Sequence, residues 1–244
     1  MSEMSWREIE FIVEETNLVI IPIGANECYG PHLPTGSDTI VALDVSIILA
    51  KRVGAVVAPP IPVGYSQALL GFPGTISISS NVLTDLLRDY CQCLIQSGFR
   101  RIFFVCGHLG NIPSITIVAN ELHEKAIFGM VDLWRFFAKE SMGIVETKEI
   151  PEGHASEVGT SILLTLHPDL LKLEFAIKEL PKSSFYKEMH DVYTFPTLRE
   201  VSSSGVVGNP LKASRKKGEK ILKKSLDSLT EFLQEFKKAK ISIK

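Results

Sequence analysis

LVIIPIGANECYGPHLPTGSD occupies residues 18–38 of the chain and has the pattern of a strand followed by a polar loop. Its first six residues are mostly β-branched, as is typical of a strand that is buried on both faces of a parallel sheet. The apolar run ends at Gly24, and the loop leads to Asp38, after which TIVALDVSIILAKRV has apolar residues at helical spacing. Asp38 or Thr39 is suited to cap this helix. Strand, loop and helix in this order predict a parallel α/β unit.

The same order of elements recurs along the rest of the chain. RIFFVC at 101–106 runs into a polar turn, and a helical pattern at 111–124 precedes an apolar strand at 127–133. A shorter apolar strand is expected at 55–58. Further helices are expected at residues 4–16, 81–97, 156–166 and 211–236, with Asn81 as the cap of the second. We therefore predict an α/β fold with a mostly parallel central sheet and helices on both faces.

Two long segments lack a regular pattern. GYSQALLGFPGTISISS at 64–80 is rich in glycine and serine and is too long for an ordinary connection, and such loops are commonly functional. Residues 174–209 are rich in Pro, Ser and Gly, and we interpret them as a surface excursion over the sheet. Because neither segment predicts a core of its own, we expect one domain that spans residues 1–244.

Composition excludes several classes of protein. With 45% hydrophobic and 22% charged residues, the 244-residue chain has ample apolar material for a core. Its formal net charge of -2 gives no overall field that would draw it to nucleic acid or to an anionic membrane. No apolar run approaches the roughly 20 residues that span a bilayer. The four cysteines match neither a disulfide framework nor a four-thiolate zinc site. We expect a cytoplasmic protein without nucleic-acid or membrane partners.

Polar side chains gather after the expected strands, where the ligand site of an α/β sheet forms. The first loop carries Glu27, Cys28, Tyr29, His32 and Asp38, and the turn after RIFFVC carries His108 and Asn111. A third group, GHASE, has His154 and Glu157 three residues apart at a helix start and hence on one face. Carboxylate and imidazole donors that converge on a pocket bind zinc, manganese or iron, because these metals accept both oxygen and nitrogen.

Each of these residues also has a structural interpretation. An aspartate at a helix start is commonly a cap, a histidine such as His108 could bond local backbone in its turn, and His32 between two prolines could brace its loop. Trp134 could line a pocket at a strand end, but a core position is favoured. The joint pattern of donors in three loops at one sheet edge favours a metal site.

Several blocks of the sequence resemble the creatininase (creatinine amidohydrolase) family. GANECYGPHLPTGSD is similar to the family pattern G-x-x-E-x-H-G-P-H-L-P-x-x-T-D. The segments FPGTISIS at 72–79, CGHLGN at 106–111 and HASEVGTS at 154–161 resemble F-P-G-T-x-S, N-G-H-G-G-N and H-A-G-E-x-E-T-S. GVVGNPLKASRKKGEKIL at 205–222 resembles the closing segment of the family and its terminal helix. The likeness runs nearly end to end and in order, so the five blocks together are far more specific than any one of them.

The resemblance implies a three-layer αβα sandwich that assembles into homo-oligomers, often hexamers, and holds two adjacent divalent metals that share a carboxylate. Asp38 matches the shared carboxylate, Glu27 and His108 match the other ligands of the first metal, and His154 matches the histidine that moves protons during amide hydrolysis. Creatininase itself supplies a second-metal glutamate where this chain has Gly110. Glu157 fits an alternative position found in relatives, and its role as a ligand is our inference from geometry.

This chain departs from the family pattern at two positions. Tyr29 stands where the family has a second-metal histidine, and a phenol with a pKa near ~10 is a poor ligand. Gly159 stands where relatives have a second glutamate. The chain is therefore expected to bind one or two metal ions, and Tyr29 and His32 are possible contacts for a second metal or for the substrate.

These observations predict a metal-dependent amidohydrolase that acts on a non-peptide carbon–nitrogen bond, in a cyclic amide or formamide of a small polar substrate. Metal held by Glu27, Asp38 and His108 would supply hydroxide at neutral pH, and His154 would pass a proton to the leaving nitrogen. The alternative is a non-catalytic or regulatory metal- or ligand-binding protein on the same fold, as the residues at 29 and 159 suggest. A nucleotide-binding domain is disfavoured because no strand is followed by a glycine-rich phosphate motif.

Overall fold

A computed structural model describes residues 1–148, 150, 153–181 and 194–240. Its sheet has four parallel strands in the order β2-β1-β3-β4. Their bounds are Leu18–Ile23 for β1, Val56–Val57 for β2, Arg101–Cys106 for β3 and Ile127–Asp132 for β4. Ile23 is in register with Cys106, and Cys106 with Asp132. Three strands therefore end level with one another, and their loops open at the same edge of the sheet.

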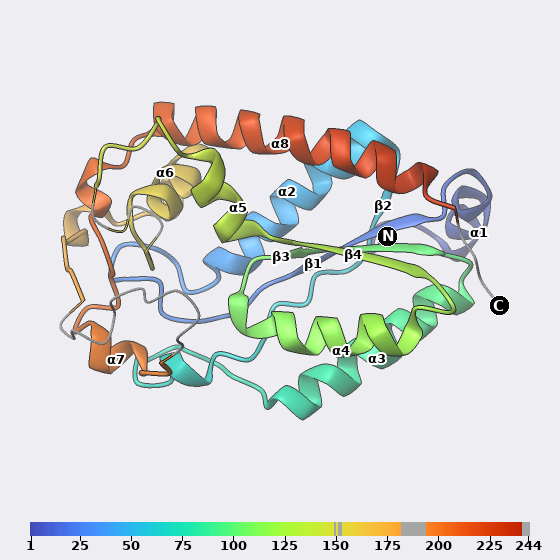
Figure 1. The fold of residues 1–244 in the computed structure, drawn as a ribbon, viewed down its shortest axis with the longest axis horizontal. Helices are drawn as coiled ribbons and strands as arrows, with labels where there is room; N and C mark the ends of the chain where they lie inside the picture. Colours follow the sequence, from blue (N-terminus) through green and yellow to red (C-terminus); the bar gives the residue numbers. More distant parts are fainter. Residues whose placement is uncertain (149, 151–152, 182–193, 241–244) are drawn as a thin grey trace.

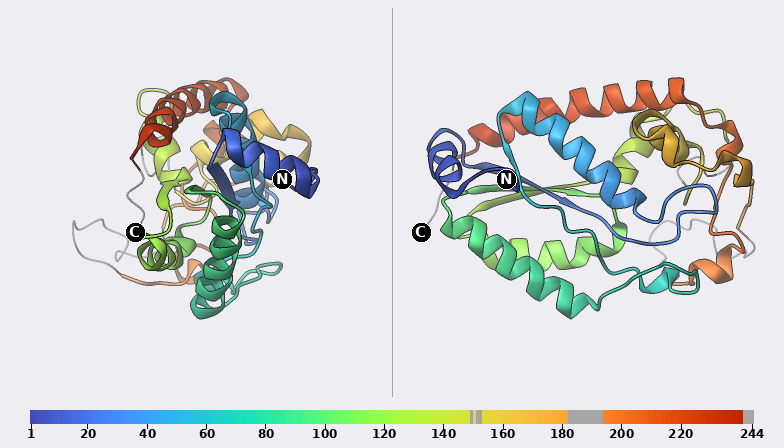
Figure 2. Two further views of the ribbon diagram at one scale, coloured as in Figure 1. Left: turned by 90° about the vertical axis from the view of Figure 1, so that its right-hand side faces the viewer. Right: turned by 180° about the vertical axis from the view of Figure 1, so that it is seen from behind.

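Helices cover both faces of the sheet (Figures 1 and 2). One face packs against α2 (Ser37–Val53), α5 (Leu133–Glu140), α6 (Glu157–Leu166) and α8 (Arg215–Lys238). The other packs against α1 (Trp6–Glu15), α3 (Ser80–Gln96) and α4 (Ile112–Leu122). A short helix, α7 (Leu198–Val201), lies near the end of the molecule where α6 is found (Figure 1). The three-layer αβα sandwich expected from the sequence is confirmed.

The strands are buried on both faces, which explains their apolar sequences. Leu18 and Ile20 of β1 pack with the helices of one layer, whereas Val19 and Ile21 pack with the other. All six residues of β1 are buried. Because each fully buried aliphatic side chain contributes about 1.5–3 kcal/mol, this alternation ties the sheet to both helical layers. Within the described residues, no helix is both long enough and apolar enough to cross a membrane.

Two helix starts differ from the sequence expectation. α2 begins at Ser37 with Gly36 as its N-cap residue, so Asp38 lies inside the first turn and its side chain is not a cap. α3 begins one residue before Asn81, and the side chain of Ser79 accepts a hydrogen bond from the Val82 N–H. Serine is as effective an N-cap as asparagine, so the sequence at this point offered two equivalent starts.

The sequence does not predict the helix α5, and the terminal helix starts later in the chain than residue 211, where the sequence predicts its start. The expected strand at 127–133 ends at Asp132, whose side chain caps α5 by accepting from the Arg135 N–H. At the other end of the chain, Pro210–Lys212 forms a 3-10 turn, and α8 starts after Ser214. Part of the excursion at 174–209, namely 182–193, lies outside the described residues.

Candidate metal centre

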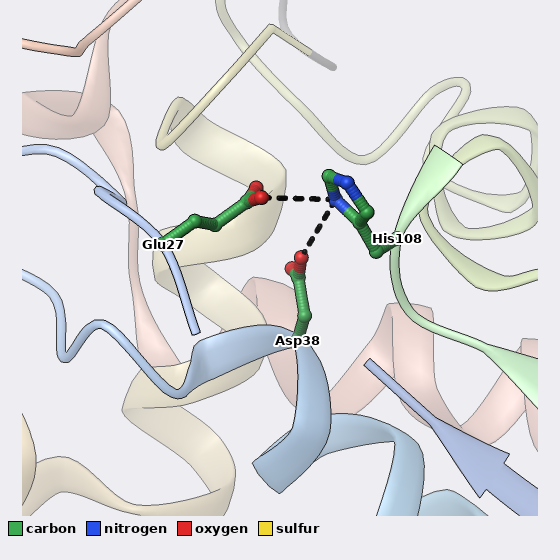
Figure 3. A group of neighbouring side chains, drawn as sticks. All are labelled: Glu27, Asp38 and His108. Atoms are coloured by element: carbon green, nitrogen blue, oxygen red, sulfur yellow. Dashed lines mark ion pairs between the residues drawn. The ribbon is translucent and has the colours of Figure 1, made fainter. Parts of the chain in front are cut away.

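Three buried side chains that follow β1 and β3 converge at the carboxyl edge of the sheet (Figure 3). Glu27 follows β1, Asp38 lies in the first turn of α2, and His108 follows β3. The Nδ1 atom of His108 is 3.1 Å from Glu27 Oε2 and 3.3 Å from Asp38 Oδ2. One ligand atom from each residue lies within 4.8 Å of the others. The structure therefore brings together the three residues expected for the first metal.

Two glycines allow this convergence because they let backbone segments touch. A Cβ at Gly24 would lie 2.3 Å from the Thr39 nitrogen, and a Cβ at Gly107 would lie 2.4 Å from the Asp38 carbonyl oxygen. Contacts this short would push the start of α2 away from the ends of β1 and β3. The glycines hold Asp38 next to the turn that carries His108.

A hydrogen bond from Nε2 to the backbone orients the imidazole of His108. Nε2 lies 2.8 Å from the Tyr65 carbonyl oxygen, so it carries the hydrogen and donates it. This bond directs Nδ1 toward the two carboxylates, which is how outer partners commonly fix a metal-binding histidine. Burial lowers the pKa of His108, but the carboxylates of Asp38 and Glu27 outweigh burial and raise it well above its usual value.

The two carboxylates each have a further hydrogen-bond donor. The Ser66 hydroxyl donates to Glu27 Oε2 at 2.6 Å, and the indole Nε1–H of Trp134 donates to Asp38 Oδ1 at 2.8 Å. Burial and the neighbouring charge of Glu27 raise the pKa of Asp38 to about 6. Burial also raises the pKa of Glu27, but the histidines beside it outweigh that effect and lower its pKa.

The donor set fits a divalent metal. The carboxylates of Glu27 and Asp38 are buried, with ligand oxygens within 4.8 Å of each other, so they repel each other unless a cation lies between them. Two oxygens and one imidazole nitrogen suit zinc, manganese or iron. Three protein ligands also leave a coordination position open, as in catalytic rather than structural sites.

His154 lies beside this group, just before α6. Its Nδ1 is 2.8 Å from the Gly205 carbonyl oxygen and donates to it, and its Nε2 is 3.6 Å from Glu27 Oε1. Nε2 is buried and has no hydrogen-bond partner. Burial lowers the pKa of His154, whereas the Glu27 carboxylate outweighs burial and raises it. The structure leaves one nitrogen of His154 available at the centre.

A cavity of about 650 Å³ opens over these residues. Glu27, Asp38, His108 and His154 line it, and much of the remaining wall is apolar or aromatic. Tyr29 is 5% exposed, and its ring centroid lies 4.7 Å from that of His154 and 5.5 Å from that of Trp134. Burial raises the pKa of Tyr29 well above its usual value, so the phenol stays protonated. The cavity has room for a small organic molecule.

Sequence reasoning missed several residues of this site. Trp134, for which a core position was favoured, lines the cavity and bonds Asp38. Its place in α5 depends on a helix that was not expected. Ser66 lies in the loop at 64–80 that was identified as functional, but a serine among several carries no distinguishing signal. The carbonyl groups of Tyr65 and Gly205 are backbone atoms, which residue type does not reveal.

Glu157, expected as a second-metal ligand, does not join the group. Its carboxylate accepts hydrogen bonds from the backbone N–H groups of Glu146 and Thr147 and from Lys217 Nζ, the last at 2.6 Å. Both oxygens are therefore engaged away from the cavity. In this structure Glu157 is the buried partner of Lys217, which corrects the expectation.

Replacing Lys217 with methionine is expected to lower the free energy of unfolding by about 3 kcal/mol, because it leaves Glu157 as a buried charge without its cation. Urea unfolding followed by circular dichroism measures the change. The double variant Lys217→Met, Glu157→Gln should recover part of the loss. A single variant as stable as the native chain would show that the pair is unimportant for folding.

His32 is also placed away from the cavity. It is buried, and its Nε2 lies 2.9 Å from the Thr160 hydroxyl. It is absent from the cavity lining, so the expected contact with a second metal or substrate is not formed in this structure. Burial lowers the pKa of His32 to about 4. The side chain is a neutral core histidine.

The pKa of His32 predicts a pH effect on stability. The unfolded chain binds a proton below its pKa of about 6.5, whereas the folded chain does so only near 4. Stability should therefore fall as pH decreases from about 6.5 toward 4, by up to about 1.4 kcal/mol per pH unit for this group. Urea unfolding of the native chain and of His32→Gln at several pH values isolates the effect. Equal slopes for the two proteins would contradict it.

Comparisons with known proteins agree with the geometry. The family model described as creatinine amidohydrolase matches residues 2–233. The chain is 30% identical over 256 residues to creatinine amidohydrolase of Pseudomonas putida, with 96% of each chain covered. It is 30% identical to the mycofactocin precursor peptide peptidase of Mycolicibacterium smegmatis, over 84% of this chain and 79% of the relative. Among solved structures, a manganese creatininase aligns with a TM-score of 0.82 at 26% identity, covering 96% of this chain and 97% of its own. A mutant creatininase of Zn–Zn type aligns with a TM-score of 0.81 at 26% identity, covering 96% of both chains.

Proposed function

This chain belongs to the creatininase family, and we propose that it is a metal-dependent hydrolase of a non-peptide carbon–nitrogen bond in a small cyclic amide or formamide. The named relatives are hydrolases, one of creatinine and one of a peptide precursor. One observation carries the proposal: the buried donors of Glu27, Asp38 and His108 converge beside a nitrogen of His154 that has no hydrogen-bond partner. That arrangement combines a cation site with a group that can accept and release a proton.

Glu27, Asp38 and His108 would hold the metal, for which zinc, manganese and iron are the candidates. When bound, such an ion acidifies water and polarises a carbonyl group. Ser66 and the Tyr65 carbonyl oxygen keep the ligands in place by binding Glu27 and His108. The largely apolar wall of the cavity would strengthen electrostatic interactions among the reacting groups.

His154 would move the proton. Hydrolysis adds the oxygen of water to the carbonyl carbon, breaks the carbon–nitrogen bond and transfers a proton of that water to the leaving nitrogen. Nδ1 of His154 is committed to the Gly205 carbonyl oxygen, so Nε2 is the atom that accepts and releases this proton. An imidazole suits this transfer because its ordinary pKa lies near neutrality.

The proposal is tested with purified protein that is stripped of metal and then reloaded with zinc, manganese or iron. Each form is incubated with cyclic amides, formamides and short peptides, and the released amine is measured. We expect turnover of a cyclic amide or formamide that depends on metal. Cleavage of peptides alone would assign the chain to the activity of its peptidase relative. Bound metal without turnover of any of these compounds would favour the non-catalytic alternative.

Two further proposals concern the state of the protein. The family model spans nearly the whole chain, which supports one domain, and we propose a homo-oligomer, with a hexamer as the specific form to test by light scattering. All four cysteines are free in the structure, and Cys28, Cys91 and Cys106 are buried, in keeping with the proposed cytoplasmic location.

A further inference from the structure

The two oxygens of Asp38 have different partners. Oδ2 faces His108 at 3.3 Å, on the side of the candidate metal. Oδ1 accepts the indole N–H of Trp134 at 2.8 Å. A carboxylate that bridges two ions most commonly gives one oxygen to each of them. With Oδ1 bound to a donor that cannot be displaced without moving Trp134, Asp38 has only one oxygen for a metal.

The space beside Asp38 is occupied by aromatic side chains. Tyr29 is buried, and its ring packs against both Trp134 and His154. Its hydroxyl would lie 3.1 Å from a Cβ at Gly159, which is a tight contact, so a side chain on α6 at that position would press against Tyr29. Trp134 in turn packs against Phe137 in the core. These contacts hold the indole where it binds Asp38.

The turn after β3 cannot supply another ligand either. A Cβ at Gly110 would lie 2.2 Å from the Tyr65 carbonyl oxygen and 2.6 Å from Nε2 of His108. Any side chain at this position would break the bond that orients His108. Among the described residues, Glu27, Asp38 and His108 form the one cluster of metal-binding side chains.

We propose that this centre holds one divalent metal ion and that Trp134 is a positioning residue, whose indole takes the oxygen of Asp38 that a second ion would need. The proposal rests on the metal site of the proposed function and adds its stoichiometry. Trp134 fixes the Asp38 carboxylate with Oδ2 toward His108, where it would be a ligand of the ion. Outer partners of this kind are commonly worth roughly 10 to 100-fold in metal affinity.

The test is a titration of the metal-stripped protein with Mn²⁺. Calorimetry measures the number of bound ions, and electron paramagnetic resonance shows whether they are isolated. We expect one equivalent to bind with the hyperfine signal of an isolated ion. Two equivalents with an exchange-coupled signal would overturn this inference and leave the metal-dependent function standing. Binding of no ion would overturn both. The native chain suffices for this measurement, so it does not depend on the folding of a variant.

Trp134→Phe tests the positioning role, because it keeps an aromatic ring against Tyr29 and Phe137 but removes the N–H group. We expect Mn²⁺ affinity to fall roughly 10 to 100-fold, with one equivalent still bound and with the thermal midpoint of the metal-free protein close to that of the native chain. The matched control is Trp6→Phe, at the other and exposed tryptophan, which should leave affinity unchanged. Native affinity in Trp134→Phe would refute the positioning role.

Discussion

Replacing His154 with alanine is expected to reduce hydrolysis by about 10²–10⁴-fold and to leave the bound metal in place. The nitrogen that would move the proton lies 3.6 Å from Glu27 Oε1 and has no hydrogen-bond partner in the structure. His154 is not among the three clustered donors, so its removal should not empty the metal site. Steady-state kinetics on a substrate established by the metal-reloading assay, together with metal analysis of the same sample, measures both quantities.

Two further variants separate chemistry from packing. His154→Asn keeps a side-chain donor that can reach the Gly205 carbonyl oxygen but lacks a titrating nitrogen, and it should be as inactive as the alanine variant. His123→Ala removes an exposed histidine at the C-terminal end of α4 and should turn over at the native rate. Native turnover in His154→Ala would show that another group moves the proton.

The strands and the convergence of the metal ligands were predictable from the sequence. Leu18–Ile23 and Arg101–Cys106 are buried on both faces, so their apolar runs have sharp ends, and the bounds match the expectation. The loops that follow parallel strands in register begin at the same edge of the sheet. Glu27 and His108 therefore lie close together although they are far apart in the chain. The prediction needed only the direction of the strands.

Glu157 does not share a helical face with His154, because the residues between them are not helical. A spacing of three residues puts two side chains on one face only within a helix, and α6 begins only at Glu157. Ala155 between them has a φ of 53°, in the left-handed region, so the backbone turns before the helix starts. The two side chains consequently point to different places, His154 to the cavity and Glu157 to Lys217.

Replacing Asp38 with asparagine is expected to weaken metal binding by more than about 100-fold, the upper end of what outer partners contribute. The amide has nearly the same shape and its oxygen can still accept from Trp134, but an amide nitrogen then faces His108 where Oδ2 would bind the metal. Hydrolysis should fall in parallel with occupancy. Asp89→Asn, at an exposed site on α3, is the matched control and should bind metal as the native chain does.

The same variant should separate stability from function. Burial and the charge of Glu27 raise the pKa of Asp38, so this carboxylate is costly to ionise in the metal-free protein. Metal-free Asp38→Asn should therefore melt at or above the temperature of the metal-free native chain. Added Zn²⁺ at about 100 times its dissociation constant for the native chain should stabilise the native chain by about 2.7 kcal/mol and the variant by no more than about 0.4 kcal/mol. If Zn²⁺ stabilised the variant as much as the native chain, the ion would bind elsewhere, because a site that contains Asp38 loses a ligand in this variant. The proposed function requires the ion at Asp38, where its charge also offsets the buried carboxylate.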